Sequence, residues 1–109
     1  AMSDAAGPPA LESDTAQLVA LARAGDLEAF GTLVDRHARA ARRVAAAALA
    51  TRDDADDVVQ EACLTAWQRL GDLADPLAFR SWLLRITWRK ALDRRRSVRT
   101  WLTRLVSGD

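Results

Sequence analysis

Apolar residues recur at every third or fourth position along most of the chain after residue 13, which is the spacing of a helix with one buried face. The pattern divides into segments separated by residues that end or begin helices. We therefore predict an all-α fold, a compact bundle of about four helices with no strands. The predicted helices cover residues 14–24, 27–50, 52–70 and 77–96, with a short extra helix at 98–106.

Short polar side chains mark three of the predicted helix starts. Asp14 with Gln17 three residues later resembles a capping box, so we expect the first helix to begin at Asp14. Asp26 precedes the second helix, and Thr51 with Asp54 precedes the third. Such residues accept hydrogen bonds from backbone N–H groups of the first helical turn, which otherwise have no partner.

Glycine and proline mark the remaining boundaries. Gly25 and Gly71 are expected to end the first and third helices, and Pro76 to start the fourth. Gly31 lies inside the second predicted helix, where glycine costs up to about 1 kcal/mol relative to alanine. We therefore expect another helix to pack closely against Gly31.

The ends of the chain differ in composition from its middle. Residues 1–13, with Gly7 and two prolines, are predicted to be a flexible leader that is in part a cloning remnant. Residues 14–97 form the predicted helical domain. Residues 98–109 are expected to be the start of an interdomain linker or a short helix, which includes Trp101, Leu102, Leu105 and Val106.

The third helix places two large apolar residues on its polar side. With 100° of rotation per residue, its core stripe consists of Val59, Ala62, Cys63, Ala66 and Leu70. Leu64 and Trp67 instead fall among Asp57, Gln60, Glu61 and Gln68. A tryptophan one turn from a leucine and ringed by polar residues has the composition of a binding hot spot. Coverage by a neighbouring segment of the same chain is the alternative.

The fourth helix is apolar on two sides. Phe79, Trp82, Leu83 and Ile86 form one side, and Leu84, Trp88 and Ala91 form another, nearly opposite. Arg85, Arg89 and Arg96 lie between the two sides. A helix of this kind is central in a bundle or shared with a partner. Arginine beside aromatic rings suits single-stranded DNA, because guanidinium groups bind phosphates and rings stack on unpaired bases. Core packing of Trp82 and simple solvation of the arginines are the alternatives.

Charge separates along the sequence even though the net charge is +1. Residues 1–75 hold 13 acids and 7 arginines, a net charge of −6. Residues 76–109 hold 2 acids and 9 basic residues, a net charge of +7. This asymmetry suggests a basic surface for nucleic acid beside an acidic surface for another partner.

The sequence argues against a membrane, secreted or enzymatic protein. No apolar stretch approaches the roughly 18 residues that cross a bilayer, and the single Cys63 fits a reducing cytoplasm. His37 is the only histidine and has no nucleophile at a recognisable spacing. The acids Asp53, Asp54, Asp56 and Asp57 lack the glycine and ligand spacing of a calcium loop. We therefore expect no catalytic residues, no metal and no cofactor.

Two stretches together resemble region 2 of bacterial RNA polymerase sigma factors of the extracytoplasmic-function (ECF) group. They are "DDADDVVQEACLTAWQRL" and "FRSWLLRITWRKALDRRR", and "LVALARAGDLEAFGTLVDRH" resembles the opening of that family. The resemblance covers most of residues 14–96. It implies a cytoplasmic, DNA-binding transcription initiation factor that binds the β′ clamp helices of core RNA polymerase. It also implies that this domain melts and reads the non-template strand of the promoter −10 element. An anti-sigma factor is a common partner in that family.

The resemblance assigns roles to individual residues. The polymerase-binding residues implied by position are Asp57, Gln60, Glu61, Leu64 and Trp67. The DNA-binding residues implied are Leu73, Ala74, Asp75, Pro76, Leu77, Arg80, Trp82, Arg85, Arg89 and Lys90. In that family the loop before the fourth helix takes a flipped base into a pocket, and flipping costs a few kcal/mol.

The chain departs from the family pattern at three positions. The family usually has a polar residue where Trp88 stands, asparagine where Arg89 stands, and a small or acidic residue where Pro76 stands. These differences bear on base preference rather than on the fold. The family also carries a second DNA-binding domain, region 4, so we expect this chain to be one domain of a longer protein.

Two other functions compete with this interpretation. A helical protein-interaction module would use Leu64 and Trp67 without binding DNA, and the basic, aromatic fourth helix argues against it. A helix-turn-helix repressor is disfavoured because no short glycine turn separates two compact helices in the basic half.

Overall fold

The computed structural model describes residues 8–108, and the side chains from residue 14 onward. Four α-helices follow one another: α1 (Pro8–Arg23), α2 (Leu27–Ala48), α3 (Arg52–Gln68) and α4 (Phe79–Ser107). Two short 3-10 helices, η2 (Leu70–Asp72) and η3 (Pro76–Ala78), lie in the connection between α3 and α4. The described residues contain no strand, so the predicted all-α bundle is confirmed.

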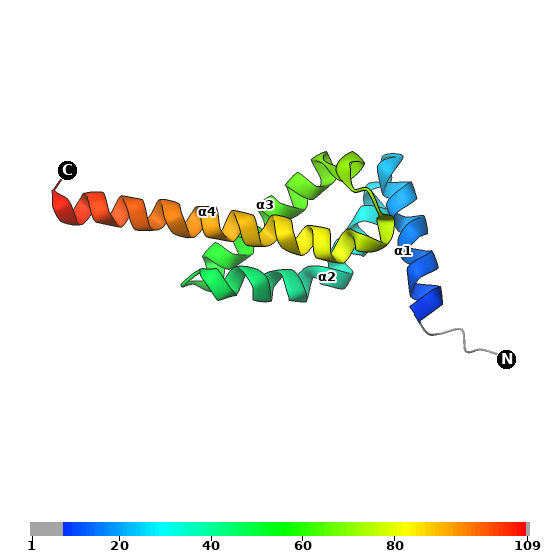
Figure 1. Cartoon of the computed structure of the whole chain (residues 1–109), viewed down its shortest axis with the longest axis horizontal. Coiled ribbons are helices and arrows are strands. Elements are labelled where there is room, and N and C mark those ends of the chain that lie inside the picture. The colour runs from blue at the N-terminus through cyan, green and yellow to red at the C-terminus, as the bar shows by residue number, and fades with distance from the viewer. Residues whose placement is uncertain (1–7, 109) are drawn as a thin grey trace.

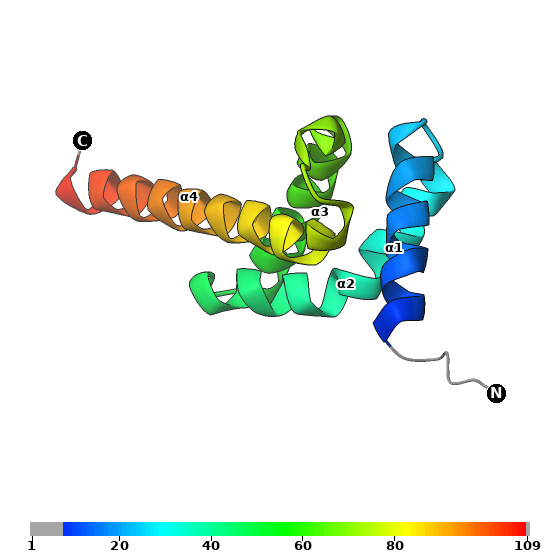
Figure 2. The ribbon, with the colours of Figure 1, turned by 45° about the vertical axis from the view of Figure 1, so that its right-hand side comes forward.

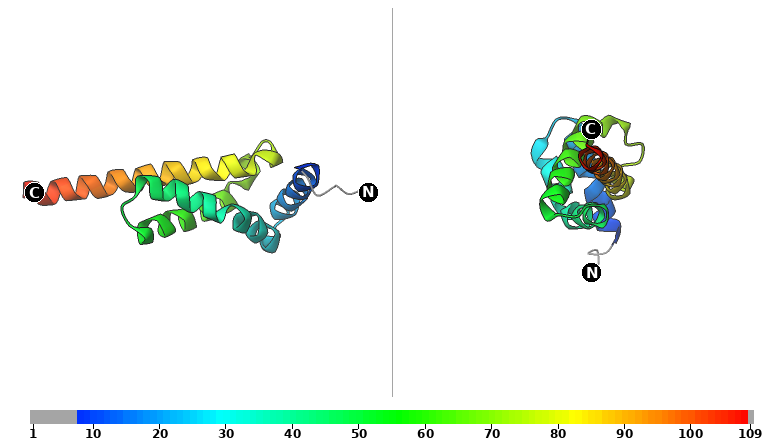
Figure 3. Two further views of the ribbon diagram at one scale, coloured as in Figure 1. Left: turned by 90° about the horizontal axis from the view of Figure 1, so that it is seen from below. Right: turned by 90° about the vertical axis from the view of Figure 1, so that its left-hand side faces the viewer.

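The first three helices surround the beginning of α4, and the rest of α4 extends away from them (Figure 1). α1 stands across one end of the bundle, α2 runs along α4, and α3 crosses α4 obliquely (Figure 2). The molecule measures 68 × 27 × 21 Å, and the views from below and along the long axis show α4 projecting as a single rod (Figure 3). No helix among residues 8–108 is long and apolar enough to span a membrane.

Two apolar clusters hold the bundle together. The first joins the end of α1, the start of α2, the α3–α4 connection and the start of α4. The second joins the later part of α2, the start of α3 and the middle of α4, and four of its six buried residues are alanines. α4 contributes to both clusters, with Phe79 and Leu83 in the first and Ala91 in the second. Of the predicted second apolar side, Leu84 and Ala91 pack in the second cluster, whereas Trp88 is 41% exposed, so that side is only partly buried.

The predicted caps of α2 and α3 are present. The carboxylate of Asp26 accepts a hydrogen bond from the N–H of Ala29 at 3.1 Å. The hydroxyl of Thr51 accepts one from the N–H of Asp54, also at 3.1 Å. Gly25 ends the α1 region with φ of +103°, a conformation that glycine adopts without strain. Local capping chemistry thus fixes these boundaries.

The first helix begins six residues earlier than predicted. α1 starts at Pro8, so the part of the expected leader from residue 8 to residue 13 is helical, while residues 1–7 lie outside the described residues. Proline is suited to a first helical turn because its missing N–H would have no partner there. Asp14 is therefore inside the helix, and its carboxylate pairs with Arg36 of α2 rather than capping α1.

The fourth helix is longer than predicted. Residues 98–106 continue α4 without a break, so the separate short helix was wrong. No glycine or proline interrupts residues 79–107, and the helix ends only at Gly108, where φ is +81°. A helix of 29 residues is about 43 Å long, which explains the elongated shape.

Two expectations about glycine were wrong. α3 ends at Gln68, and Gly71 lies in η2 with no positive φ, because the chain tightens into a 3-10 turn after α3. A Cβ atom added to Gly31 would meet no atom within 4 Å, so no helix packs closely there. α2 tolerates this glycine because its buried face, with Phe30 and Leu33, holds the helix in place.

Candidate functional site

The outward face of α3 presents an exposed leucine among polar residues. Leu64 is 58% exposed, and Asp57, Gln60 and Glu61 are exposed around it. The buried residues Val58, Val59, Ala62 and Ala66 face the bundle on the other side of the helix. This face, which consists of Asp57, Gln60, Glu61, Leu64 and the edge of Trp67, is called the α3 face below.

Trp67 is less exposed than its sequence position suggests. Its ring lies 5.1 Å from the ring of Phe30, measured between centroids, and the side chain packs against the first apolar cluster. On the helical wheel Trp67 lies about 40° beyond the core stripe, and an indole ring is large enough to reach across that gap. Trp67 therefore joins the core to the α3 face, and the prediction that it points fully outward was wrong.

An arginine from α4 holds the acidic side of the α3 face. The guanidinium of Arg94 donates to Oε2 of Glu61 at 2.8 Å and to Oδ1 of Asp54 at 3.2 Å. Arg94 was absent from the predicted site residues. Its partners lie 33 and 40 positions away in the sequence, a separation that no local motif encodes. The two ion pairs fix α3 against the middle of α4.

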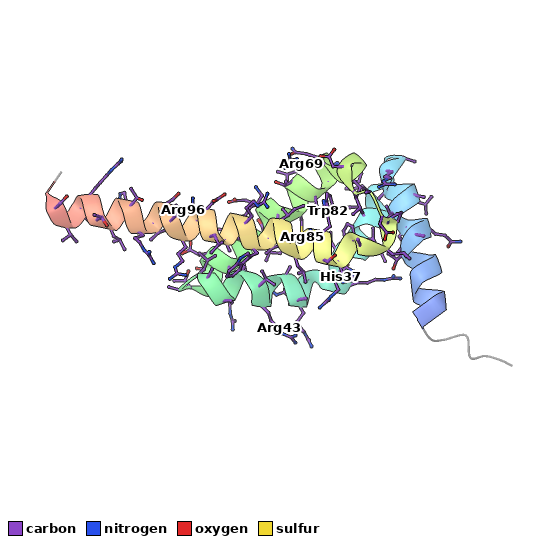
Figure 4. The ribbon with its side chains drawn as sticks, viewed as in Figure 1. His37, Arg43, Arg69, Trp82, Arg85 and Arg96 are labelled. Carbon is purple, nitrogen blue, oxygen red and sulfur yellow. The ribbon has the colours of Figure 1, made fainter. Side chains whose placement is uncertain are left out.

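The basic residues of α4 gather with α3 residues around a recess of about 380 Å³. Trp82, Arg85, Arg89 and Lys90 line it, and they are four of the predicted DNA-binding residues. Thr65, Arg69 and Asp72 come from α3 and the segment after it, and Ile86 and Asp93 complete the lining. Trp82 and Arg85 lie on the same part of α4, with Arg69 on the side of α3 (Figure 4). The recess is called the α4 recess below.

The α4 recess combines charge with an aromatic surface. Four cationic and two acidic side chains line it, so positive charge prevails. The ring of Trp82 lies 6.1 Å from the ring of Phe79, and Trp82 is partly buried at the edge of the first cluster. Guanidinium groups beside an anchored indole ring can bind a phosphate and stack a base. The sequence did not predict Arg69 as a DNA-binding residue, because Arg69 belongs to the part of the chain with a net negative charge.

Hydrogen bonds from α1 and within the loop hold the segment between α3 and α4. Arg23 of α1 donates to the backbone carbonyl groups of Leu70 and Leu73. The carboxylate of Asp75 accepts from the N–H of Leu77 at 3.0 Å. The loop therefore has a fixed shape in the free chain.

The predicted loop residues divide into buried and exposed ones. Leu73 is 3% exposed and belongs to the first cluster, so its side chain anchors the loop instead of facing outward. Ala74, Asp75 and Leu77 are exposed, and Pro76 is partly exposed. Only these four side chains offer a surface to a ligand.

His37 belongs to α2, and its ring approaches Phe79 at the start of α4. Its ring is 5.9 Å from the ring of Phe79, and its Nδ1 atom is buried without a hydrogen-bond partner among the described residues. Burial lowers the pKa of His37, and the positive charges of Arg80 and Arg36 lower it further. These effects favour the neutral form of the imidazole.

We expect the stability of the chain to fall when the pH drops below the ordinary histidine pKa of 6.5. The unfolded chain then binds a proton that folded His37 resists, so the equilibrium shifts toward unfolding. Thermal melting between about pH 7 and about pH 5.5, above the range of ordinary carboxylates, should show this loss. In His37→Leu the melting temperature should change much less over this range. An equal pH dependence in that variant would contradict the assignment to His37.

The described residues offer no obvious place for a metal. No group of three or more histidine, cysteine, aspartate or glutamate side chains among residues 8–108 is arranged to hold an ion. Cys63 is partly buried, and burial raises the pKa of its thiol, which disfavours the thiolate that metals and electrophiles need. Asp54, at the start of α3, has a structural role, since it pairs with Arg94.

The chain is similar to known transcription factors. The family Sigma-70 region 2 matches residues 33–101. RNA polymerase sigma factor NccH of Alcaligenes xylosoxydans xylosoxydans is 43% identical over 72 residues, which are 66% of this chain and 39% of that protein. RNA polymerase sigma factor CnrH of Cupriavidus metallidurans is 41% identical over 87 residues, which are 78% of this chain and 46% of that protein.

A third similar protein is the ECF RNA polymerase sigma factor SigM of Mycobacterium tuberculosis. It is 41% identical over 85 residues, which are 78% of this chain and 43% of that protein. The chain thus spans less than half the length of these three relatives. No solved structure matched the chain.

Proposed function

The chain belongs to the Sigma-70 region 2 family, and from this premise we propose that it docks on core RNA polymerase and opens and reads the promoter −10 element. It acts by binding and not by catalysis. We also propose that it works in the cytoplasm, where it meets the polymerase. Binding of an anti-sigma factor stays a prediction.

One observation supports this proposal above the others. α3 and α4 pack against each other. α3 carries the acidic and apolar α3 face, and α4 carries most of the basic and aromatic α4 recess. The first surface suits a protein partner, because an apolar anchor ringed by polar groups is typical of binding hot spots. The second suits unpaired DNA. Arg94 links the two helices, so both surfaces keep a fixed relation to each other.

In the proposed arrangement the α3 face binds the β′ clamp helices. Leu64 supplies an apolar contact, while Asp57, Gln60 and Glu61 supply acceptors and charge at its edge. Arg94 keeps Glu61 in place, although a partly exposed ion pair of this kind contributes only modestly to stability.

Replacing Leu64 with alanine is expected to weaken binding to core polymerase by more than about 1 kcal/mol, because apolar anchors at an interface carry costs of this size. The thermal stability should hardly change, since the side chain is 58% exposed. Fluorescence titration of labelled chain with core enzyme measures the affinity. Leu105→Ala is the matched control, because Leu105 is 62% exposed on the far part of α4. Equal affinity of the two variants would remove Leu64 from the interface.

The α4 recess and the exposed loop residues are proposed to bind the melted non-template strand. Arg85, Arg89 and Lys90 contact phosphates, and Trp82 offers a ring for stacking. Arg80 is exposed at the start of α4 but does not line the α4 recess, so its DNA contact stays a prediction. The loop residues Ala74, Asp75, Pro76 and Leu77 are the proposed base-reading part.

Replacing Arg85 and Arg89 with alanine is expected to weaken promoter binding by a similar factor for every −10 sequence and to flatten its salt dependence. The reason is that phosphates carry no sequence information. Substitutions at Asp75 and Leu77 should instead change which −10 variant binds best. Holoenzyme binding to a panel of partly single-stranded −10 variants measures both effects.

Two outcomes would contradict this assignment. Loop substitutions that affect all −10 variants equally would leave the loop a simple connector. Unchanged DNA binding in the Arg85 and Arg89 variant would favour a helical protein-interaction module that does not bind DNA.

A further inference from the structure

A second basic surface lies on α2, away from the α4 recess. Arg36, Arg39, Arg42 and Arg43 fall within about 120° of the α2 circumference, on the side opposite its buried residues. Figure 4 shows Arg43 pointing away from α4, while Arg69 lies on the other side of the molecule. The α2 surface is therefore separate from the α4 recess.

Part of this surface forms a groove with the start of α3. Arg39, Arg42, Arg43 and Arg52 line the groove, whose volume is about 890 Å³. Asp56 is the one acid in its lining, and Asp35 lies nearby on the α2 surface. None of the four lining arginines forms an ion pair within the part of the chain that the structure describes. Positive charge therefore prevails in this groove.

Ordinary helix chemistry does not account for these arginines. Basic residues stabilise a helix when they lie in its last turn, but the last turn of α2 contains none. Arg39, Arg42, Arg43 and Arg52 are all exposed. Concentrated like charge is unfavourable unless a partner of opposite charge binds it. A partner is therefore the better explanation.

The chemistry of the groove favours a phosphate backbone over unpaired bases. Its lining contains no aromatic side chain on which a base could stack. Arg39 to Arg43 spans four residues, about 6 Å along the helix, so these guanidinium groups can reach neighbouring phosphates of a duplex. The groove borders the α3 face, because Gln60 is part of its lining.

We propose that the outer face of α2, with the groove formed by Arg39, Arg42, Arg43 and Arg52, binds the phosphate backbone of duplex DNA independently of base sequence. This site goes beyond the docking and −10 functions. It gives the chain a grip on double-stranded DNA on a surface separate from the α4 recess. Arginine suits the role because its planar fork can bind phosphate oxygens in pairs.

The test is binding of the free chain to a fluorescent duplex of scrambled sequence and to the matching single strand. Arg39→Gln with Arg43→Gln should lower duplex affinity about tenfold at low salt and reduce the slope of log affinity against log salt by about 2. The charge-matched control is Arg99→Gln with Arg104→Gln on the far part of α4. The control should retain most of the duplex affinity and slope. If the first variant unfolds, Arg42→Gln with Arg52→Gln probes the same groove.

Three results would overturn the proposal. Equal losses in the groove and control variants would reduce the effect to net charge. Absence of duplex binding by the unaltered chain at low salt would remove the site. A groove variant that binds duplex normally but loses affinity for core polymerase would assign the groove to an acidic protein surface. Since no polymerase is present in the DNA assay, failure of the docking proposal would leave its result unaffected.

Discussion

Replacing Phe79 with alanine is expected to destabilise the chain by about 3–5 kcal/mol, the range for truncation of a fully buried aromatic ring. Phe79 is 0% exposed, and its ring lies about 6 Å from the rings of Phe30, His37 and Trp82. Removing it would leave a cavity at the point where α4 begins and the loop ends. Small domains have only about 5–15 kcal/mol of stability, so much of the folded population would be lost.

Urea unfolding followed by circular dichroism measures this loss. Trp88→Ala is the matched control, because Trp88 is an aromatic residue of the same helix that is 41% exposed. The control should cost less than half as much. Comparable losses in the two variants would mean that Phe79 is not the central packing residue of the first cluster.

Replacing Trp67 with alanine is expected to lower both stability and polymerase affinity. One side of the indole packs on Phe30, so we expect a stability loss of about 2 kcal/mol, below the range for a fully buried tryptophan. The other edge belongs to the proposed docking face, where tryptophan anchors typically cost about 2 kcal/mol or more on truncation. Circular dichroism gives the folded fraction, and titration with core polymerase gives the affinity of that fraction.

Trp67→Phe separates the two effects. A phenyl ring keeps much of the packing against Phe30, so this variant should recover most of the stability but only part of the affinity. Full polymerase affinity in the folded fraction of Trp67→Ala would show that Trp67 serves the core alone. The docking face would then rest on Leu64 and its polar neighbours.

The sequence by itself determined the helical elements and most of their boundaries. Hydrophobic spacing and caps act over one or two turns, so Asp26, Thr51 and Gly25 mark boundaries that neighbouring residues impose. It also determined most of the core stripe of α3, with Val59, Ala62 and Ala66, because helical geometry fixes the direction of each side chain. The start of α1 and the unbroken length of α4 were predicted wrongly, although Pro8 at the first turn of α1 and the lack of glycine or proline before Gly108 in α4 are local signals for both.

Only the tertiary structure decided how these helices share their surfaces. Arg94 pairs with Glu61, and Arg69 and Arg85 both line the α4 recess. The members of each pair are far apart in the sequence. The side chains of Trp67 and Leu73 are more buried than the sequence predicted. They pack against residues of neighbouring elements, which a helical wheel does not represent. The groove of α2 arginines likewise forms only when α3 packs beside α2, within a half of the chain whose net charge is negative. Helix packing brings residues that are distant in the sequence together. Surfaces of opposite charge therefore form, although the charges nearly balance over the whole chain.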